Sequence, residues 1–125
     1  MRLLLDTHVA LWSFDENPTL GGEALKAIMD EENEVLVSFV SVWEICIKQA
    51  LGKLDAPLDL ERAIQLCGFR LIGIRLEHVL AVRDLPLHHR DPFDRMLIAQ
   101  AQVENLTLVT RDPRILKYNL QVLEA

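Results

Sequence analysis

The sequence predicts an α/β fold, a three-layer α/β/α sandwich around a central parallel sheet of four or five strands. Short segments that are apolar throughout alternate along the chain with longer segments of helical periodicity. Continuously apolar strands are typical of parallel sheets that are covered on both faces. The chain has 125 residues and shows no repeat or linker-like stretch, so we expect one domain over residues 1–125.

Five short apolar segments predict the strands of this sheet. In chain order they are Leu3–Leu5, Glu34–Ser38, Phe69–Ile74, Leu106–Thr110 and Leu120–Leu123. A first helix is expected to begin near Val9. Further helices are expected over Ala24–Glu31, Val42–Leu51, Leu60–Cys67, Glu77–Arg83 and Pro92–Glu104. Gly52 is a natural end for the helix before it, and Asp91 followed by Pro92 is a natural start for the last helix.

Composition excludes several classes of protein. Apolar residues make up 50% of the chain and charged residues 26%, which is typical of globular proteins rather than disordered or fibrous ones. No apolar run approaches the roughly 18 residues of a membrane span, and Asp6 interrupts any signal-peptide core. We therefore expect a soluble, cytoplasmic protein with no membrane association. Cys46 and Cys67 lie in apolar helical patterns without CxxC spacing, which favours buried core positions over a disulfide or zinc site.

The net charge of −6 is unevenly distributed. Taken over the whole chain, this negative net charge argues against a nucleic-acid partner, because binding to phosphates requires Lys and Arg. However, seven of the 19 acidic residues lie between positions 15 and 34, where Lys26 is the one basic residue. The rest of the chain is electrically balanced, so the acidity belongs mainly to one solvated stretch.

Several acidic residues have a possible structural role as helix caps. Asp6 lies between the first strand and the first helix, where an N-cap would accept a backbone N–H. Glu44 follows Ser41 by three residues, the spacing of a capping box. Asp91 and Asp112 each precede a proline, an arrangement that is common at helix starts. Capping alone is therefore one interpretation of these acids.

The predicted topology favours a second interpretation, in which the acids form one site. Asp6, Glu44 and Asp112 all follow strands, so they are expected at the carboxyl edge of the sheet. The helix that carries Asp94 begins at the same edge. Two like charges about 4 Å apart repel by roughly 4 kcal/mol at an effective dielectric near 20, which a bound cation would relieve. Oxygen ligands without a His or Cys cluster favour Mg²⁺ or Mn²⁺, and such ions support phosphodiester hydrolysis.

The chain also resembles a known family in four segments that carry these acids. They are Leu3-Leu4-Leu5-Asp6-Thr7-His8, then Val40-Ser41-Val42-Trp43-Glu44-Ile45 with Lys48 and Gly52-Lys53-Leu54, then the run from His89 to Ala101 (HRDPFDRMLIAQA), and finally Val109-Thr110-Arg111-Asp112. In this order they are similar to the PIN-domain ribonucleases, in particular the VapC-like toxins of toxin–antitoxin pairs. The resemblance spans nearly the whole chain.

The resemblance implies a fold, an activity and a set of partners. It implies a PIN-like fold and a metal-dependent endoribonuclease that cuts structured RNA such as tRNA or rRNA. Asp6, Glu44 and Asp94 would be the acidic triad that holds Mg²⁺ or Mn²⁺, and Asp112 would be the fourth acid. We prefer Asp94 to Asp91 as the ligand because Asp91 has the stronger capping role. An antitoxin partner and a homodimer are also implied.

Other residues near these acids are candidates for a supporting role. Thr110 is similar to a hydroxyl that often supports such a site, and Thr7 is adjacent to Asp6. Arg95 and Arg111 flank the acids and are candidates either for a phosphate clamp or for surface ion pairs. For Lys48 the sequence favours a solvated helix face.

The sequence leaves the roles of the histidines open. His8, His88 and His89 are possible general bases, but the sequence favours a packing or surface role for His8. The loop pair His88-His89 is expected to be near enough to touch RNA, without a defined role.

The same residues argue against two alternative functions of such a fold. A phosphotransfer receiver needs an acceptor Asp after the third strand, where Ile72-Gly73-Ile74 is found. A phosphatase with an aspartyl nucleophile needs a second Asp two positions after Asp6, where His8 is found. The remaining alternative is a non-catalytic PIN-like binding module whose acids serve only as helix caps.

Overall fold

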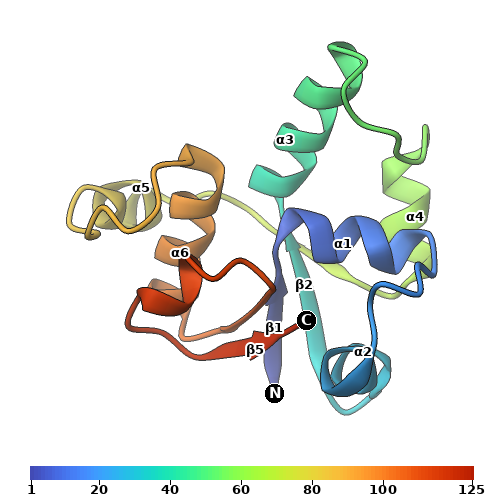
Figure 1. Ribbon diagram of the computed structural model, residues 1–125, viewed down its shortest axis with the longest axis horizontal. Helices are drawn as coiled ribbons and strands as arrows, with labels where there is room; N and C mark the ends of the chain where they lie inside the picture. The colour runs from blue at the N-terminus through green and yellow to red at the C-terminus, as the bar shows by residue number, and fades with distance from the viewer.

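Five parallel strands form a single sheet in the computed structural model, which describes residues 1–125 (Figure 1). The strands are β1 (Arg2–Leu5), β2 (Glu34–Ser38), β3 (Arg70–Ile72), β4 (Thr107–Thr110) and β5 (Val122–Glu124). Their order across the sheet is β3-β2-β1-β4-β5, and every neighbouring pair is parallel. The strand order therefore reverses at β1, which places the crevice of an open α/β sheet at the carboxyl end of β1.

Helices cover both faces of the sheet, as Figure 1 shows. The helices are α1 (Thr7–Phe14), α2 (Gly22–Met29), α3 (Phe39–Ala50), α4 (Leu60–Leu66), α5 (Leu76–Val82) and α6 (Pro92–Glu104). On one face, Leu4 of β1 lies in a core with residues of α6 and of the 3₁₀ turn η1 (Ile115–Lys117). On the other face, Leu3 and Leu5 lie in a core with residues of α1 and α2. The predicted fold class is confirmed.

Burial on both faces of the sheet explains why β1 is apolar from Leu3 to Leu5, after the exposed Arg2. Successive side chains of a strand point to opposite faces of the sheet, and both faces of β1 are covered. Leu3, Leu4 and Leu5 are each completely buried. At roughly 1.5–3 kcal/mol for each buried leucine, this strand is a major source of folding free energy. The backbone that leads directly to Asp6 is therefore rigidly held.

Helix α3 starts three residues earlier than the sequence predicts. Strand β2 ends at Ser38, whose hydroxyl accepts the backbone N–H of Val40 at 3.0 Å and caps the helix at once. Ser41 and Glu44 consequently lie inside the helix and are buried. The predicted capping box at these two residues is therefore wrong, because no loop separates the strand from the helix.

Two further sequence predictions are corrected. No α-helix starts at Asp112; its carboxylate instead accepts the backbone N–H of Arg114 at 2.9 Å, which closes a turn before η1. Cys46 and Cys67 are exposed rather than buried, because each lies on the solvent side of its helix or at its end. None of the helices combines the length and hydrophobicity needed to cross a membrane.

Candidate active site

The four predicted acids line one pocket of about 510 Å³. Asp6 directly follows β1 and Asp112 follows the neighbouring strand β4, while Glu44 lies on α3 and Asp94 in the first turn of α6. The other lining residues are His8, Trp12, Lys48, Asp91, Arg111, Pro113 and Arg114. The acids thus converge at the carboxyl edge of the sheet, where the topology places the crevice.

Asp6 is fixed by two hydrogen bonds. Its Oδ1 accepts the backbone N–H of Val9 at 2.8 Å, so Asp6 does cap α1, as predicted. Its Oδ2 accepts the hydroxyl of the fully buried Thr110 at 2.5 Å. Burial raises the pKa of the Asp6 carboxyl above its ordinary value, although the bonds from Thr110 and Val9 oppose that rise. Thr110 therefore supports the charged form and orientation of Asp6.

Glu44 is held by Thr7 and Lys48. The Thr7 hydroxyl donates to Glu44 Oε1 at 2.7 Å, and Lys48 Nζ donates to Oε2 at 2.6 Å from one helical turn away. Because the Thr7 hydroxyl has only one proton, Ser41 Oγ, at 3.1 Å, donates to Thr7 Oγ1 in turn. The bond with Glu44 raises the pKa of Lys48, so Lys48 stays a cation. The Lys48 side chain is 37% exposed, as expected for the solvated helix face that the sequence favours, but its bond to Glu44 also places it at the pocket.

Asp94 and Asp91 have different roles at the start of α6. Asp91 Oδ1 accepts the backbone N–H of Phe93 at 2.8 Å and that of Asp94 at 3.3 Å, which confirms its predicted role as N-cap. Asp94 caps nothing. Burial, followed by repulsion from Asp91, raises the pKa of Asp94 to about 7, against the opposing effect of His89. A carboxylate that is costly to ionise where it stands is typical of functional sites.

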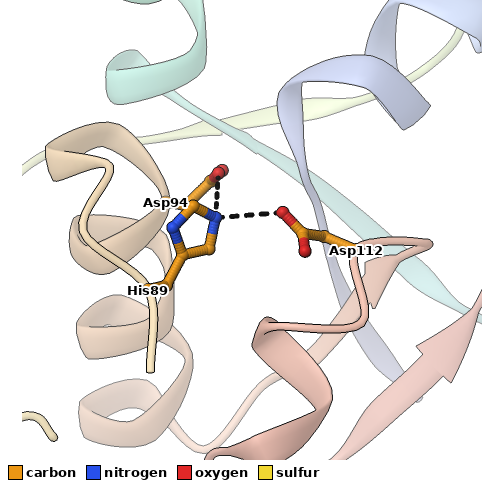
Figure 2. Close-up of side chains that lie close together, drawn as sticks. All are labelled: His89, Asp94 and Asp112. Carbon is orange, nitrogen blue, oxygen red and sulfur yellow. Dashed lines mark hydrogen bonds and ion pairs between the residues drawn. The ribbon is translucent and has the colours of Figure 1, made fainter. Parts of the chain in front are cut away.

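Asp112 is surrounded by donors. Burial opposes its ionisation, but hydrogen bonds from the side chain and backbone of Arg114, together with His89, outweigh burial and lower the pKa of the carboxyl. The imidazole Nε2 of His89 lies 2.9 Å from Asp112 Oδ2 and 2.8 Å from Asp94 Oδ2 (Figure 2). Asp112 is thus charged at neutral pH and shares His89 with its neighbour.

Arg95 does not face the pocket. Its guanidinium donates to four carbonyl oxygens, those of Val82, Leu85, Pro86 and His89. The structure therefore gives Arg95 an architectural role, holding the loop before α6, in place of either the phosphate clamp or the surface ion pair that the sequence left open.

Arg111 does line the pocket, together with Arg114. The Arg111 guanidinium lies 4.6 Å from the centre of the Trp12 ring and donates to the carbonyl oxygens of Thr19 and Ala125. It is thus fixed at the rim, in a position that suits a phosphate contact.

The sequence predicted neither the contact of His89 with Asp112 nor the bonds that tie Lys48 to Glu44 and Arg114 to Asp112. The spacing of Glu44 and Lys48, four residues apart on a helix, is a signal that could have identified Lys48. Asp112 with Arg114 two residues later is a weaker signal for a local turn. No local signal identifies His89, because its contact with Asp112 spans 23 residues and depends on the packing of its loop.

The donor set fits a hard divalent cation. The four predicted acids offer carboxylate oxygens only, the ligands that Mg²⁺ and Mn²⁺ prefer. Burial, and after it repulsion from Asp91, Asp6 and Glu44, makes the charge of Asp94 costly where it stands. A cation among them would remove this cost, so the residues present suit Mg²⁺ or Mn²⁺.

Comparison with known proteins identifies the family. Residues 3–120 match the PIN domain, and the chain belongs to the PIN domain family, whose members are generally nucleases. The family resemblance seen in the sequence is thereby confirmed. Comparison with curated protein sequences gives no match.

Solved structures with a similar fold include VapBC toxin–antitoxin complexes. VapBC2 from Rickettsia felis, bound to a DNA fragment from its promoter, is 16% identical, with a TM-score of 0.71 over 99% of this chain and 98% of that chain. DNA-bound VapBC from Salmonella typhimurium is 12% identical, with a TM-score of 0.69 over 99% and 98%. FitAcB from Neisseria gonorrhoeae is 19% identical, with a TM-score of 0.67 over 97% and 96%. At these identities the similarity shows a shared fold.

Proposed function

We propose that this protein is a Mg²⁺- or Mn²⁺-dependent endoribonuclease that cuts structured RNA, such as tRNA or rRNA, as the toxin of a toxin–antitoxin pair. One observation carries the proposal: Asp6, Glu44, Asp94 and Asp112 line a single open pocket in a PIN domain. We take the whole chain, residues 1–125, to be one nuclease domain acting in the cytoplasm.

The proposed roles follow from the contacts of each side chain. Asp6, Glu44, Asp94 and Asp112 would hold the cation. When bound, such an ion activates water and offsets negative charge that develops on the phosphate. Thr110 keeps Asp6 oriented and favours its charged form, while Thr7 keeps Glu44 oriented.

Basic side chains at the rim of the pocket would meet the RNA backbone. Lys48, Arg111 and Arg114 line the pocket beside the acids. Each is anchored by a hydrogen bond: Lys48 to Glu44, Arg111 to backbone carbonyls and Arg114 to Asp112. Anchored cations lose little conformational entropy on binding phosphate. They would therefore position the scissile phosphate without being consumed in the reaction.

An apolar groove supports the proposal of an antitoxin partner. The groove, of about 890 Å³, runs between α1, α2 and α4, and its apolar lining includes Leu20, Leu25, Ile28, Leu66 and Phe69. Trp12 lines both this groove and the acidic pocket. A peptide segment lying in the groove would therefore reach the pocket, which suits inhibition by an antitoxin.

A second apolar surface supports the proposal of a homodimer. Phe39 and Trp43 of α3 are exposed, as are Leu76, Val79 and Leu80 of α5. Large exposed apolar surfaces are uncommon in monomers. Light scattering tests this proposal: the dimer should dissociate when Trp43 is changed to Glu, and a monomeric unsubstituted protein would refute it.

The capping-only alternative accounts for part of the site. Asp6 and Asp91 do cap α1 and α6. Glu44, Asp94 and Asp112 do not cap an α-helix, yet they are brought into the same pocket. A set of helix caps gives no physical reason for this convergence, so the nuclease is the better-supported function.

The test is cleavage of RNA by the purified, partner-free chain. Total tRNA and rRNA are incubated with Mg²⁺ or Mn²⁺, with EDTA, and beside Asp94→Asn. Discrete fragments that require metal and are absent with the variant are expected. Asp84→Asn is a matched control, because it removes one exposed carboxylate that does not line the pocket. Equal cleavage by the protein and its Asp94→Asn variant would refute the site assignment.

A further inference from the structure

We infer that His89 is a positioning residue: its Nε2–H donates to Asp112 and lies in ion-pair contact with Asp94, and it thereby holds the two carboxylates in place for the cation, without being a ligand itself. This inference rests on the proposed cation site. His89 is 2% exposed, and its Nε2 lies 2.8 Å from Asp94 Oδ2 and 2.9 Å from Asp112 Oδ2 (Figure 2). The two acids come from different elements, α6 and the segment after β4.

The same geometry is compatible at first sight with a metal ligand. His89, Asp94 and Asp112 each offer one ligand atom, and these three atoms lie within 4.8 Å of one another. An imidazole with two carboxylates is a common set of metal ligands. The two roles require different protonation of the ring. A ligand needs a lone pair on Nε2, whereas a donor to a carboxylate oxygen needs a proton there.

The second ring nitrogen decides between these roles. His89 Nδ1 accepts the backbone N–H of Asp91 at 3.2 Å. Nδ1 therefore carries the lone pair, and the neutral ring carries its proton on Nε2. Histidines that ligate metals usually donate a hydrogen bond through the nitrogen that does not bind the metal. His89 has the reverse arrangement, so its Nε2–H serves as a donor to Asp112, beside Asp94.

Hydrogen bonds also fix the backbone that carries the His89 ring. The backbone N–H of His89 donates to the Tyr118 hydroxyl at 2.9 Å, and its carbonyl accepts from Arg95 at 3.1 Å. Tyr118 in turn donates to the carbonyl of Pro86 at 2.6 Å. With its backbone fixed on both sides and its ring buried, His89 presents Nε2–H at one point. Asp94 and Asp112 are thereby oriented before a cation arrives.

The first test is a nuclear magnetic resonance measurement of the ring nitrogens, made without and with saturating Cd²⁺ as a diamagnetic probe. A protonated Nε2 and an unprotonated Nδ1 are expected for His89 in both samples. Loss of the Nε2 proton on addition of Cd²⁺, with coupling between cadmium and this nitrogen, would identify His89 as a ligand and overturn the inference.

The second test compares the affinity for Mn²⁺ by titration calorimetry. His89→Leu removes the donor and should weaken Mn²⁺ binding by about 10- to 100-fold. His89→Gln keeps an N–H donor at a similar reach and should recover most of that loss. Unchanged affinity in His89→Leu, or no recovery in His89→Gln, would overturn the inference.

His78→Leu is the matched control for the loss of a buried imidazole. His78 is fully buried and has the same pattern of contacts, with Nδ1 accepting from the Arg75 N–H and Nε2 beside Glu104, but it lies outside the pocket. It should lose stability and keep its Mn²⁺ affinity. Metal binding without RNA cleavage in the unsubstituted protein would refute the proposed activity while the His89 results still hold. Failure of the unsubstituted protein to bind Mn²⁺ would overturn both proposals.

Discussion

Replacing Asp94 by Asn should stabilise the metal-free protein while removing its proposed activity. The pKa of Asp94 in the folded protein is about 7, because burial and the neighbouring Asp91 disfavour its charge, against an ordinary value of 3.8. Between these two pH values the folded state binds more protons than the unfolded state. The free energy of unfolding therefore falls as the pH rises from about 4 to 7 and is lowest, as far as Asp94 is concerned, above pH 7.

The magnitude follows from the same pKa values. At about 1.4 kcal/mol for each pH unit, the difference sets a ceiling of about 4 kcal/mol on the cost of the Asp94 charge. A fifth of the side chain is exposed, so solvent screening reduces this cost, and we expect Asp94→Asn to gain about 2 kcal/mol at pH 8. Asn has a similar size and its carbonyl oxygen can still accept from His89, so no cavity should offset the gain.

Urea unfolding in the presence of EDTA measures this effect. The midpoint of Asp94→Asn should exceed that of the unsubstituted protein at pH 8, and the difference should shrink at pH 5, where Asp94 is protonated in the folded state. Asp84→Asn, which removes an exposed charge outside the pocket, controls for net charge. A variant no more stable than the unsubstituted protein at pH 8, or a gain of equal size at both pH values, would refute the reasoning.

Three further predictions concern the cation, Thr110 and Arg95. Mg²⁺ should raise the melting temperature more at pH 8 than at pH 6, because Asp94 must release its proton to bind the ion. An equal rise at the two pH values would count against Asp94 as a ligand. Thr110→Val removes the donor to Asp6 Oδ2, so calorimetry should show weaker Mn²⁺ binding with normal circular dichroism, whereas unchanged affinity would contradict a supporting role. Arg95→Met leaves four carbonyl oxygens without their donor and should lower the free energy of unfolding by about 2–3 kcal/mol, measured by urea; a neutral effect would mean that the loop does not depend on Arg95.

The fold could be predicted from the sequence because local pattern and global topology agree. The apolar run of β1 requires cover on both faces, and the alternation of strands with helices requires parallel pairing. The same topology predicts that Asp6 and Asp112, which follow neighbouring strands, lie at one edge. Features that follow from the pattern of whole strands and helices could thus be predicted from the sequence.

Features that depend on how one element joins the next could not be predicted from the sequence. The pattern of α3 begins at Val42, but Ser38 caps the helix where β2 ends, and this places Glu44 in the helix interior. Asp112 has the sequence of a helix start, yet Arg114 closes a tight turn on its carboxylate. His89 and Arg95 acquire their roles from tertiary contacts across a loop, which leave no periodic trace in the sequence. Cys46 was misjudged because an apolar residue type does not determine which face of a helix it occupies.

The acids of the pocket are spread along almost the whole chain, from position 6 to position 112. Strand β1 also pairs with β4, a partner more than 100 residues away. A chain that has only been synthesised as far as α5 contains Asp6 and Glu44 but lacks Asp94 and Asp112. The proposed cation site therefore cannot form on a nascent chain until the segment that follows β4, with Asp112, has been added to β1 and α3.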